Sequence, residues 1–203
     1  MNFSSKILED AVNALATLPG VGKKSALRLA LHLVQDNSKK SERIAMALQK
    51  LDSDIKKCVI CFNLSDEDTC EICKSTSRNK QLICVVESVR DVMAIEDTGQ
   101  FKGRYHILGG VISPLEGISP QDLTIEALLS RIKKEEIDEL IMAISPTIEG
   151  ETTIYYISKL LKDMDVKVSI IARGVSFGGD LEYADEFTLG RSITSRIPYK
   201  TQI

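Results

Sequence analysis

No apolar run in this chain of 203 residues approaches the length of a membrane-spanning helix. The first residues, Met1 to Ser5, also lack the layout of a secretory signal peptide. The composition, 43% hydrophobic and 27% charged residues, is that of an ordinary soluble protein. We therefore expect a soluble, cytoplasmic protein with one good core and small appendages.

A strong net charge is missing as well, because the chain carries a formal charge of −3, which alone does not suggest a nucleic-acid partner. The sum hides an asymmetry along the chain. Residues 1–57 hold ten basic side chains against six acidic ones, whereas residues 79–203 hold 14 basic against 19 acidic side chains. A basic head on an acidic body places any phosphate-binding surface in the head.

A nucleotide-binding P-loop is absent, although the dipeptide Gly22-Lys23 suggests one at first sight. The motif G-x4-G-K-[ST] requires a glycine at position 17 and a hydroxyl residue after the lysine. The chain has Thr17 and Lys24 at these positions. We therefore do not expect this chain to hydrolyse ATP on its own.

Cysteine is scarce, yet four of the five cysteines are concentrated in two C-x2-C pairs that are separated by eight residues. They are Cys58, Cys61, Cys70 and Cys73. Four thiolates are the number that a structural Zn²⁺ needs to close a tetrahedral shell. Disulfides or chance spacing are the alternatives, and adjacent C-x2-C pairs without a signal peptide argue against disulfides. We predict one structural zinc ion per chain.

The basic head is predicted to consist of three helices. Apolar residues recur at helical spacing from Ile7 to Leu18, from Ala26 to Val34 and from about Ser41 to Leu51. The first two helices are joined by a Pro-Gly-Val-Gly turn at residues 19–22, which looks like a helix-hairpin-helix motif. Its glycines let the main chain approach a phosphate, and the amides at the start of the next helix point towards it.

Basic side chains follow this turn and add positive charge. Lys23, Lys24 and Arg28 lie within about a turn and a half of the helix start. The residues predicted to bind DNA are Gly20, Gly22, Lys23, Lys24 and Arg28. Contacts of this kind hold phosphates without reading the base sequence. The alternative is a plain helical hairpin with solvated lysines.

Strands and helices alternate after the cysteines. Short apolar runs predict four strands, at Gln81 to Val86, Tyr105 to Leu108, Leu140 to Ile144 and Val166 to Ala172. This alternation is typical of a parallel sheet covered on both faces. The predicted fold class is α/β, with a small helical N-terminal domain, a four-cysteine zinc knuckle, a parallel sheet flanked by helices and a short C-terminal segment.

Three glutamates follow the predicted strands. Glu87 ends the first strand, and Glu149 and Glu151 come after the third. Because the carboxyl ends of parallel strands meet at one edge of a sheet, the three carboxylates are expected near one another. They are candidate ligands for Mg²⁺.

The run Val85-Val86-Glu87-Ser88, followed after a later strand by Glu149-Gly150-Glu151, resembles the Toprim domain of topoisomerases and bacterial primases. In that domain a strand-end glutamate and an acidic D-x-D pair hold Mg²⁺ near a phosphodiester. The resemblance leaves open an enzyme as the alternative function. That enzyme would be a Mg²⁺-dependent Toprim nuclease, or a related phosphodiester-processing protein, acting through the three glutamates.

The order of parts along the whole chain resembles one family, the RecR recombination mediators of bacteria. The shared features are the hairpin at 18–22, the cysteines at 58–73, the Toprim stretch from about 81, the runs 108–115 and 146–151, and the tail 178–185. The resemblance implies four domains: a helical helix-hairpin-helix DNA-binding domain (1–57), a four-cysteine zinc finger (58–73), a Toprim domain (81–176) and a Walker-B-like oligomerisation tail (177–203).

The resemblance also implies a function, that of a non-catalytic DNA clamp in recombinational repair. Proteins of this family form rings of four subunits, in which the helical and C-terminal parts supply the contacts between subunits. They act with RecO, and with RecF where it is present, to place RecA on gapped single-stranded DNA, and this implies a location at the nucleoid. For the tail from Asp180 to Asp185, a Walker-B-like role and an acidic turn packed against the sheet edge are both open.

Overall fold

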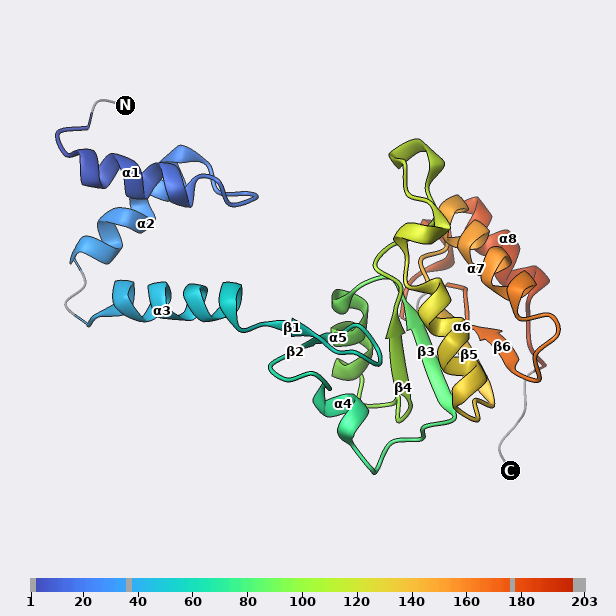
Figure 1. The fold of residues 1–203 in the computed structure, drawn as a ribbon. Helices are drawn as coiled ribbons and strands as arrows, with labels where there is room; N and C mark the ends of the chain where they lie inside the picture. Colours follow the sequence, from blue (N-terminus) through green and yellow to red (C-terminus); the bar gives the residue numbers. More distant parts are fainter. Residues whose placement is uncertain (1–2, 36–37, 176–177, 199–203) are drawn as a thin grey trace. The chain divides into compact units, whose positions relative to one another are not determined.

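The computed structural model describes residues 3–35, 38–175 and 178–198. The chain forms two compact units, residues 1–55 and residues 56–203 (Figure 1). Within the described ranges, no helix combines the length and the apolar character needed to span a bilayer.

The first unit consists of three helices, α1 (Lys6–Leu15), α2 (Lys23–Gln35) and α3 (Lys40–Ser53). The hydroxyl of Ser5 caps α1 by accepting a hydrogen bond from the amide of Leu8. Helices α1 and α2 pack through a small core of Val12, Ala26 and Ala30. Because two of these three residues are alanines, little bulk separates the helices at the contact.

Helix α3 buries none of its side chains. Its predicted apolar face exists, but Ile44, Leu48 and Leu51 are 47%, 59% and 56% exposed. The helix itself is confirmed, whereas the part of the chain that the structure describes does not cover this face.

The second unit is built on a parallel four-stranded sheet in the order β4-β3-β5-β6. Its strands are β3 (Leu82–Val86), β4 (Arg104–Ile107), β5 (Glu139–Ala143) and β6 (Lys167–Ile170). The first three lie within one residue of the predicted ranges. The edge strand β6 is shorter than the predicted Val166 to Ala172.

Helices connect and cover these strands. They are α5 (Val89–Asp97), α6 (Ile125–Lys134) and α7 (Ile148–Leu160), with short 3-10 turns at Pro114–Glu116 and Pro120–Asp122. Figure 1 shows α5 on one side of β3 and β4, and α6 and α7 on the other. The tail adds a 3-10 turn at Leu181–Tyr183 and helix α8 (Glu186–Thr194). A parallel sheet with covered faces is thus confirmed.

Strand β3 explains why this sheet has a core on each face. Alternate side chains of a strand point to opposite faces. Ile83 and Val85 pack in the cluster with α6 and α7, while Cys84 and Val86 pack in the cluster with α5. A strand buried on both faces reads as a continuous apolar run, which is why its position could be predicted closely.

His106 on β4 is a titratable side chain inside this core, with none of its surface exposed. Its Nε2 lies 3.0 Å from the hydroxyl oxygen and 3.1 Å from the carbonyl oxygen of Thr124. Burial disfavours the charged imidazolium and lowers the pKa of His106 from 6.5 to about 4. The folded protein therefore holds a neutral imidazole at neutral pH.

This burial predicts an acid sensitivity. Between pH 6.5 and 4 the unfolded chain binds a proton on His106 that the folded chain does not, so the stability present above pH 6.5 is lost as the pH falls towards 4. The full loss from this group is roughly 3 kcal/mol. Denaturant unfolding of wild type and His106→Gln at pH 7 and pH 5 measures it, and the variant should show the smaller fall. An equal fall in both proteins would assign the sensitivity to other groups.

Candidate functional site

The two C-x2-C pairs sit on a small knuckle formed by β1 (Lys56–Lys57), β2 (Leu64–Ser65) and α4 (Glu71–Lys74). In the first pair the chain turns at Phe62, which has a φ of +65°, and the Phe62 amide donates to the carbonyl of Cys58 at 3.0 Å. In the second pair the amide of Lys74 donates to the carbonyl of Cys70 at 3.0 Å. Both pairs thus lie in tight hydrogen-bonded turns.

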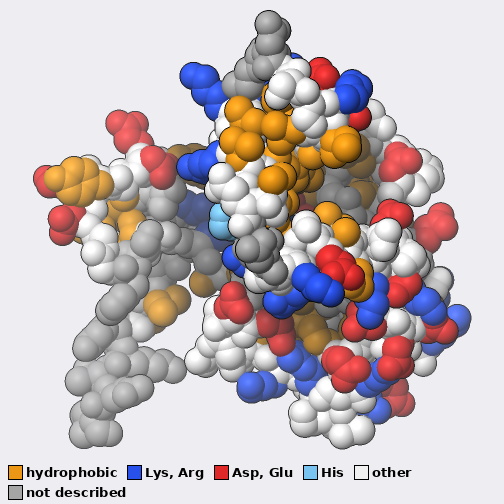
Figure 2. Space-filling view, turned by 90° about the vertical axis from the view of Figure 1, so that its left-hand side faces the viewer, with side chains coloured by type: hydrophobic (Ala, Val, Ile, Leu, Met, Phe, Trp, Pro, Cys, Tyr) orange, Lys and Arg blue, Asp and Glu red, His pale blue; other side chains and the backbone are white. Residues whose placement is uncertain are grey.

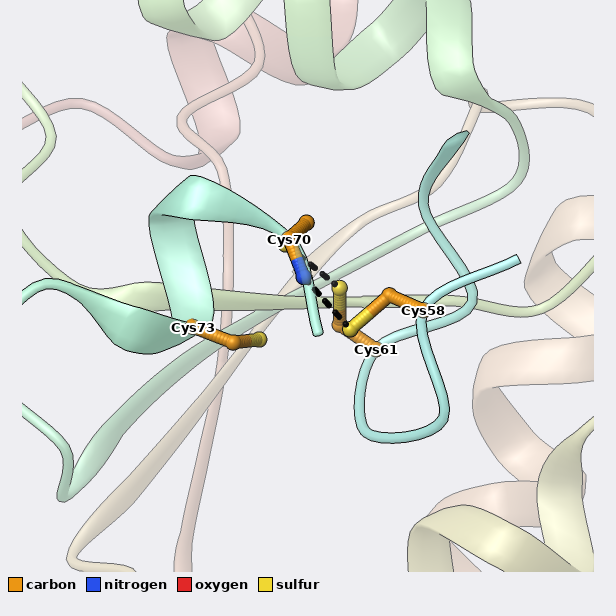
Figure 3. A group of neighbouring side chains, drawn as sticks. All are labelled: Cys58, Cys61, Cys70 and Cys73. Atoms are coloured by element: carbon orange, nitrogen blue, oxygen red, sulfur yellow. Dashed lines mark hydrogen bonds between the residues drawn. The ribbon is translucent and has the colours of Figure 1, made fainter. Parts of the chain in front are cut away.

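The knuckle brings the four predicted cysteines together. Cys58, Cys61, Cys70 and Cys73 are buried, and their sulfur atoms all lie within 4.8 Å of one another (Figure 3). The sulfurs of Cys61 and Cys70 are 3.5 Å apart. Thiolates bound to one tetrahedral zinc at about 2.3 Å lie about 3.8 Å from one another. The donor set and its spacing therefore fit a single zinc ion.

The electrostatics of this cluster also favour a cation. The neighbouring thiols of Cys61 and Cys73 lower the pKa of Cys70. The pKa of Cys61 is raised, first because its thiol is hydrogen-bonded to Cys70. Within the cluster, Cys70 is therefore the thiol that ionises most readily. Four thiolates at this burial need a dication among them, and metal binding releases the remaining protons.

The knuckle is attached to the sheet by polar and aromatic contacts. The amide of Ile107 on β4 donates to the carbonyl of Cys61 at 2.9 Å. The buried Arg104 donates from Nη2 to the carbonyl of Cys73 at 2.7 Å. The ring of Phe62 packs edge-on against His106, with the centroids 5.4 Å apart. The turns that carry the cysteines are thus held against β4.

The predicted phosphate-binding residues lie at the start of α2. Gly20 has a φ of +79°, a conformation that favours glycine, and open space surrounds the positions where Gly20 and Gly22 lack a side chain. Lys23 and Lys24 begin α2 and Arg28 follows one turn later, all exposed. No ion pair within the described ranges engages these three basic side chains. The first turn of α2 contains no acid.

The predicted carboxylates lie at the carboxyl edge of the sheet, but in different settings. Glu87 directly follows β3, and its Oε1 accepts a hydrogen bond of 2.6 Å from the amide of Ser145. Glu149 and Glu151 lie in the first turn of α7. Acids in a first turn interact favourably with the helix dipole.

The structure does not gather these three acids into a metal-holding group. Across residues 3–35, 38–175 and 178–198, the four cysteines are the one set of three or more His, Cys, Asp or Glu side chains close enough to hold a metal ion. Glu151 instead pairs with Arg173. A Mg²⁺ site formed by Glu87, Glu149 and Glu151 stays a prediction.

The tail contributes one further acid with a defined partner. The side chain of Asp185 accepts a hydrogen bond of 2.9 Å from the amide of Thr188 and caps α8. The hydrogen bond from this amide lowers the pKa of Asp185 below its ordinary value. At least one acid of the predicted Walker-B-like stretch therefore has a structural use.

Comparison with known proteins identifies the family. Family models match four successive segments: RecR helix-hairpin-helix (8–51), RecR four-cysteine zinc finger domain (55–75), Toprim domain (81–172) and RecR C-terminal (174–197). The Recombination protein RecR of Amoebophilus asiaticus is 53% identical over 199 residues, which cover 98% of this chain and all of the relative. That of Cytophaga hutchinsonii is 52% identical over 203 residues, covering 100% and 99%. The chain belongs to the RecR family.

Membership of the RecR family confirms the resemblance that the order of motifs predicted. The helix-hairpin-helix, the four-cysteine zinc finger and the Toprim domain are present in the predicted order. The match to a zinc-finger domain of this type and the clustering of the four cysteines support zinc binding. Recombination is the process with which the RecR family is associated by name.

Three residues near these sites were not singled out from the sequence. A side chain at Gly150 would place its Cβ 2.0 Å from the carbonyl oxygen of Ser145, so only glycine lets α7 pack there. The sequence showed this glycine merely as a spacer between two acids. Arg104 is buried and Arg173 is partly buried, and their partners, the carbonyl of Cys73 and the carboxylate of Glu151, lie far away in the sequence. No local motif marks such contacts.

We propose that the four cysteines bind one zinc ion, and this predicts a coupling between metal and stability. Cys58→Ser or Cys70→Ser should abolish stoichiometric zinc and lower the melting temperature, because metal binding contributes to folding. Elemental analysis and thermal unfolding measure both quantities. Cys84→Ala is the control, since Cys84 lies in the sheet core outside the knuckle and should leave the zinc content unchanged. Metal-free wild type that melts like the metal-loaded protein would contradict the prediction.

Proposed function

We propose that this protein is a non-catalytic DNA-binding clamp or adaptor of recombinational DNA repair, acting at the nucleoid in the cytoplasm. The observation that carries the proposal is the exposed, basic start of α2, without ion pairs among the described residues, in a chain of the RecR family. The clamp acts with RecO and RecF to load RecA on gapped single-stranded DNA. Family membership supports this part of the proposal.

The start of α2 provides what a phosphate needs. The first amides of a helix have no partner within the helix, and the helix dipole adds positive potential there. Lys23 and Lys24 add two charges at the same end, and the open space at Gly22 leaves room for a backbone to approach. Contacts to phosphates position a protein on DNA without base readout. DNA binding is therefore proposed to be independent of sequence.

If the basic side chains of the head contact phosphates, the affinity for DNA should fall as the salt concentration rises. Replacing Lys23 and Arg28 by alanine should weaken binding to all sequences alike, because two phosphate contacts are lost. For single-stranded DNA the slope of log K against log salt should become shallower by about 1.4. Fluorescence anisotropy at several salt concentrations measures this slope.

A matched control removes the same charge from another helix of the head. Arg43→Ala with Lys50→Ala takes two exposed basic side chains from α3 and should change the slope less. Equal slopes for wild type and the Lys23/Arg28 double variant would make the hairpin merely structural.

We propose further that the subunits assemble into a ring of four through their helical and C-terminal parts. Exposed apolar residues support this, since Leu48 on α3 is 59% exposed, Phe187 on α8 is 74% exposed and Ile197 is 87% exposed. Figure 2 shows hydrophobic side chains exposed on the face of the molecule that it presents. The exposed apolar side chains of α3 and α8 are available for contacts between subunits.

The catalytic alternative finds less support in the contacts of the acids. A Mg²⁺-dependent nuclease needs carboxylates free to hold the metal. Glu87 already accepts the Ser145 amide, and Glu151 already pairs with Arg173. Binding of Mg²⁺ by Glu87, Glu149 and Glu151 is a separate proposal, which rests on their shared edge of the sheet.

If the protein is a clamp rather than an enzyme, it should catalyse no reaction on DNA or ATP. The purified protein with Mg²⁺ or Mn²⁺ should neither cut, join nor relax DNA, and it should not hydrolyse ATP on its own. Glu87→Gln and Glu149→Gln should leave DNA affinity largely unchanged, because both residues lie in the sheet unit rather than in the head. Plasmid nicking and filter-binding assays measure these outcomes. Metal-dependent nicking by wild type that Glu87→Gln abolishes would make the protein an enzyme.

A further inference from the structure

Arg104, the first residue of β4, is a buried cation without an acidic partner. It is 8% exposed. Arg78, Arg131 and Arg173 each pair with a glutamate, whereas no ion pair in the part of the chain that the structure describes engages Arg104. A buried charge without a counter-ion is costly, so folded proteins rarely keep one. An anion other than a carboxylate is therefore expected beside Arg104.

The hydrogen bonds of Arg104 lead to the cysteine cluster. Its Nη2 donates to the carbonyl of Cys73 at 2.7 Å, and its Nε is buried without a hydrogen-bond partner. The sulfur of the same cysteine lies within 4.8 Å of the sulfurs of Cys58, Cys61 and Cys70 (Figure 3). The guanidinium is thus held beside a residue of the cluster.

The cluster supplies the missing negative charge when it holds zinc. Cysteines must be deprotonated to bind a metal, so four thiolates around one Zn²⁺ leave a net charge of about −2. All four cysteines are buried, and water therefore screens this charge little. Opposite charges attract more strongly in such a setting than at the surface. A buried cation close to the cluster offsets part of the excess negative charge.

The lysines of the knuckle are less suited to this role. Lys56 pairs with Asp68, and both side chains are more than half exposed. Lys74 pairs with Glu67 and with Glu71. The charges of exposed ion pairs are screened by water, and their interactions contribute little. Of these three cations, only Arg104 is buried and without an acid.

We propose that Arg104 is the counter-ion of the zinc–thiolate centre. It is a positioning residue, because Nη2 holds the turn of Cys73 while the charge of the guanidinium stabilises the four thiolates. The inference rests on the proposal that the four cysteines bind zinc. It adds a reason why the knuckle and β4 depend on each other: removal of the metal leaves a cation buried in the sheet unit without its anion.

The first test measures the zinc affinity of the full-length protein by competition with a chromophoric chelator. Arg104→Gln keeps an N–H donor but removes the charge. It should lower the affinity about 10- to 100-fold, as is usual when a group that supports a metal ligand is lost. Arg104→Lys keeps the charge and should restore most of the affinity. If the hydrogen bond to Cys73 were all that mattered, glutamine would substitute as well as lysine.

Arg131→Gln is the matched control. Arg131 is buried as well and donates to another backbone carbonyl of β4, that of Tyr105 at 2.8 Å, but its acid is Glu135. Its replacement should lower the melting temperature. The zinc affinity should change less than about twofold, because Arg131 shares no partner with the cysteines.

A second readout responds to the charge itself. In the cobalt-substituted protein, the energy of the sulfur-to-metal charge-transfer band depends on the electrostatic potential at the thiolates. Loss of a neighbouring cation raises the energy of the sulfur electrons. The band should therefore move to lower energy in Arg104→Gln and stay at the wild-type position in Arg104→Lys. The ligand-field bands should be the same in all three proteins, because the tetrahedral geometry is unchanged.

Arg104→Met provides a variant that does not depend on a polar replacement. Methionine fills a similar volume without a buried donor, so this variant should fold even where Arg104→Gln does not. It should show the same loss of zinc affinity and the same shift of the cobalt band. Chelation should lower the melting temperature of wild type more than that of Arg104→Met, because only wild type is left with an uncompensated cation.

The outcomes separate this inference from the proposed zinc centre. Wild-type zinc affinity and an unchanged cobalt band in Arg104→Met would reject Arg104 as the counter-ion and leave the zinc centre intact. Equal zinc affinities of Arg104→Gln and Arg104→Lys would reduce its role to a hydrogen bond. Wild-type protein without stoichiometric zinc would reject both the centre and its counter-ion.

Discussion

The second unit depends on one constraint, that strand β3 has no side facing water. Its alternate side chains require an apolar cover on each face, and the chain supplies α6 and α7 for one face and α5 for the other. The cysteine knuckle takes part in the second cover, since Phe62 and Ile72 pack into the cluster that holds Cys84 and Val86. A metal bound by the knuckle therefore stabilises the sheet core as well as its own loop.

The elements that the sequence predicted well are those whose pattern is complete within a short stretch. The apolar run of β3 and the two C-x2-C pairs need no distant residue to be recognised. Prediction was weaker where a partner lies elsewhere, as at Gly150, whose close packing on Ser145 is not visible in the local sequence. The apolar face of α3 shows the same limit. An amphipathic pattern predicts that one face of a helix is apolar, but it does not identify the residues that pack against that face.

The carboxyl edge of the sheet illustrates how acids of a Toprim-type motif can be used for structure. The amide of Ser145 donates a hydrogen bond to Glu87, and Gly150 packs closely against the carbonyl of the same residue. The first turn of α7 thus holds Glu149 and Glu151 beside the segment that fixes Glu87. Both acids interact favourably with the dipole of α7, and Glu151 also pairs with Arg173. Neither interaction requires a metal.

The distribution of charge decides which part of the chain meets DNA first. Exposed charges act only within about 8 Å at physiological ionic strength, so an acidic sheet unit neither attracts nor strongly repels a strand that is held farther away. The basic head can therefore capture DNA first. On this argument the charge of the head sets the rate at which the protein associates with DNA.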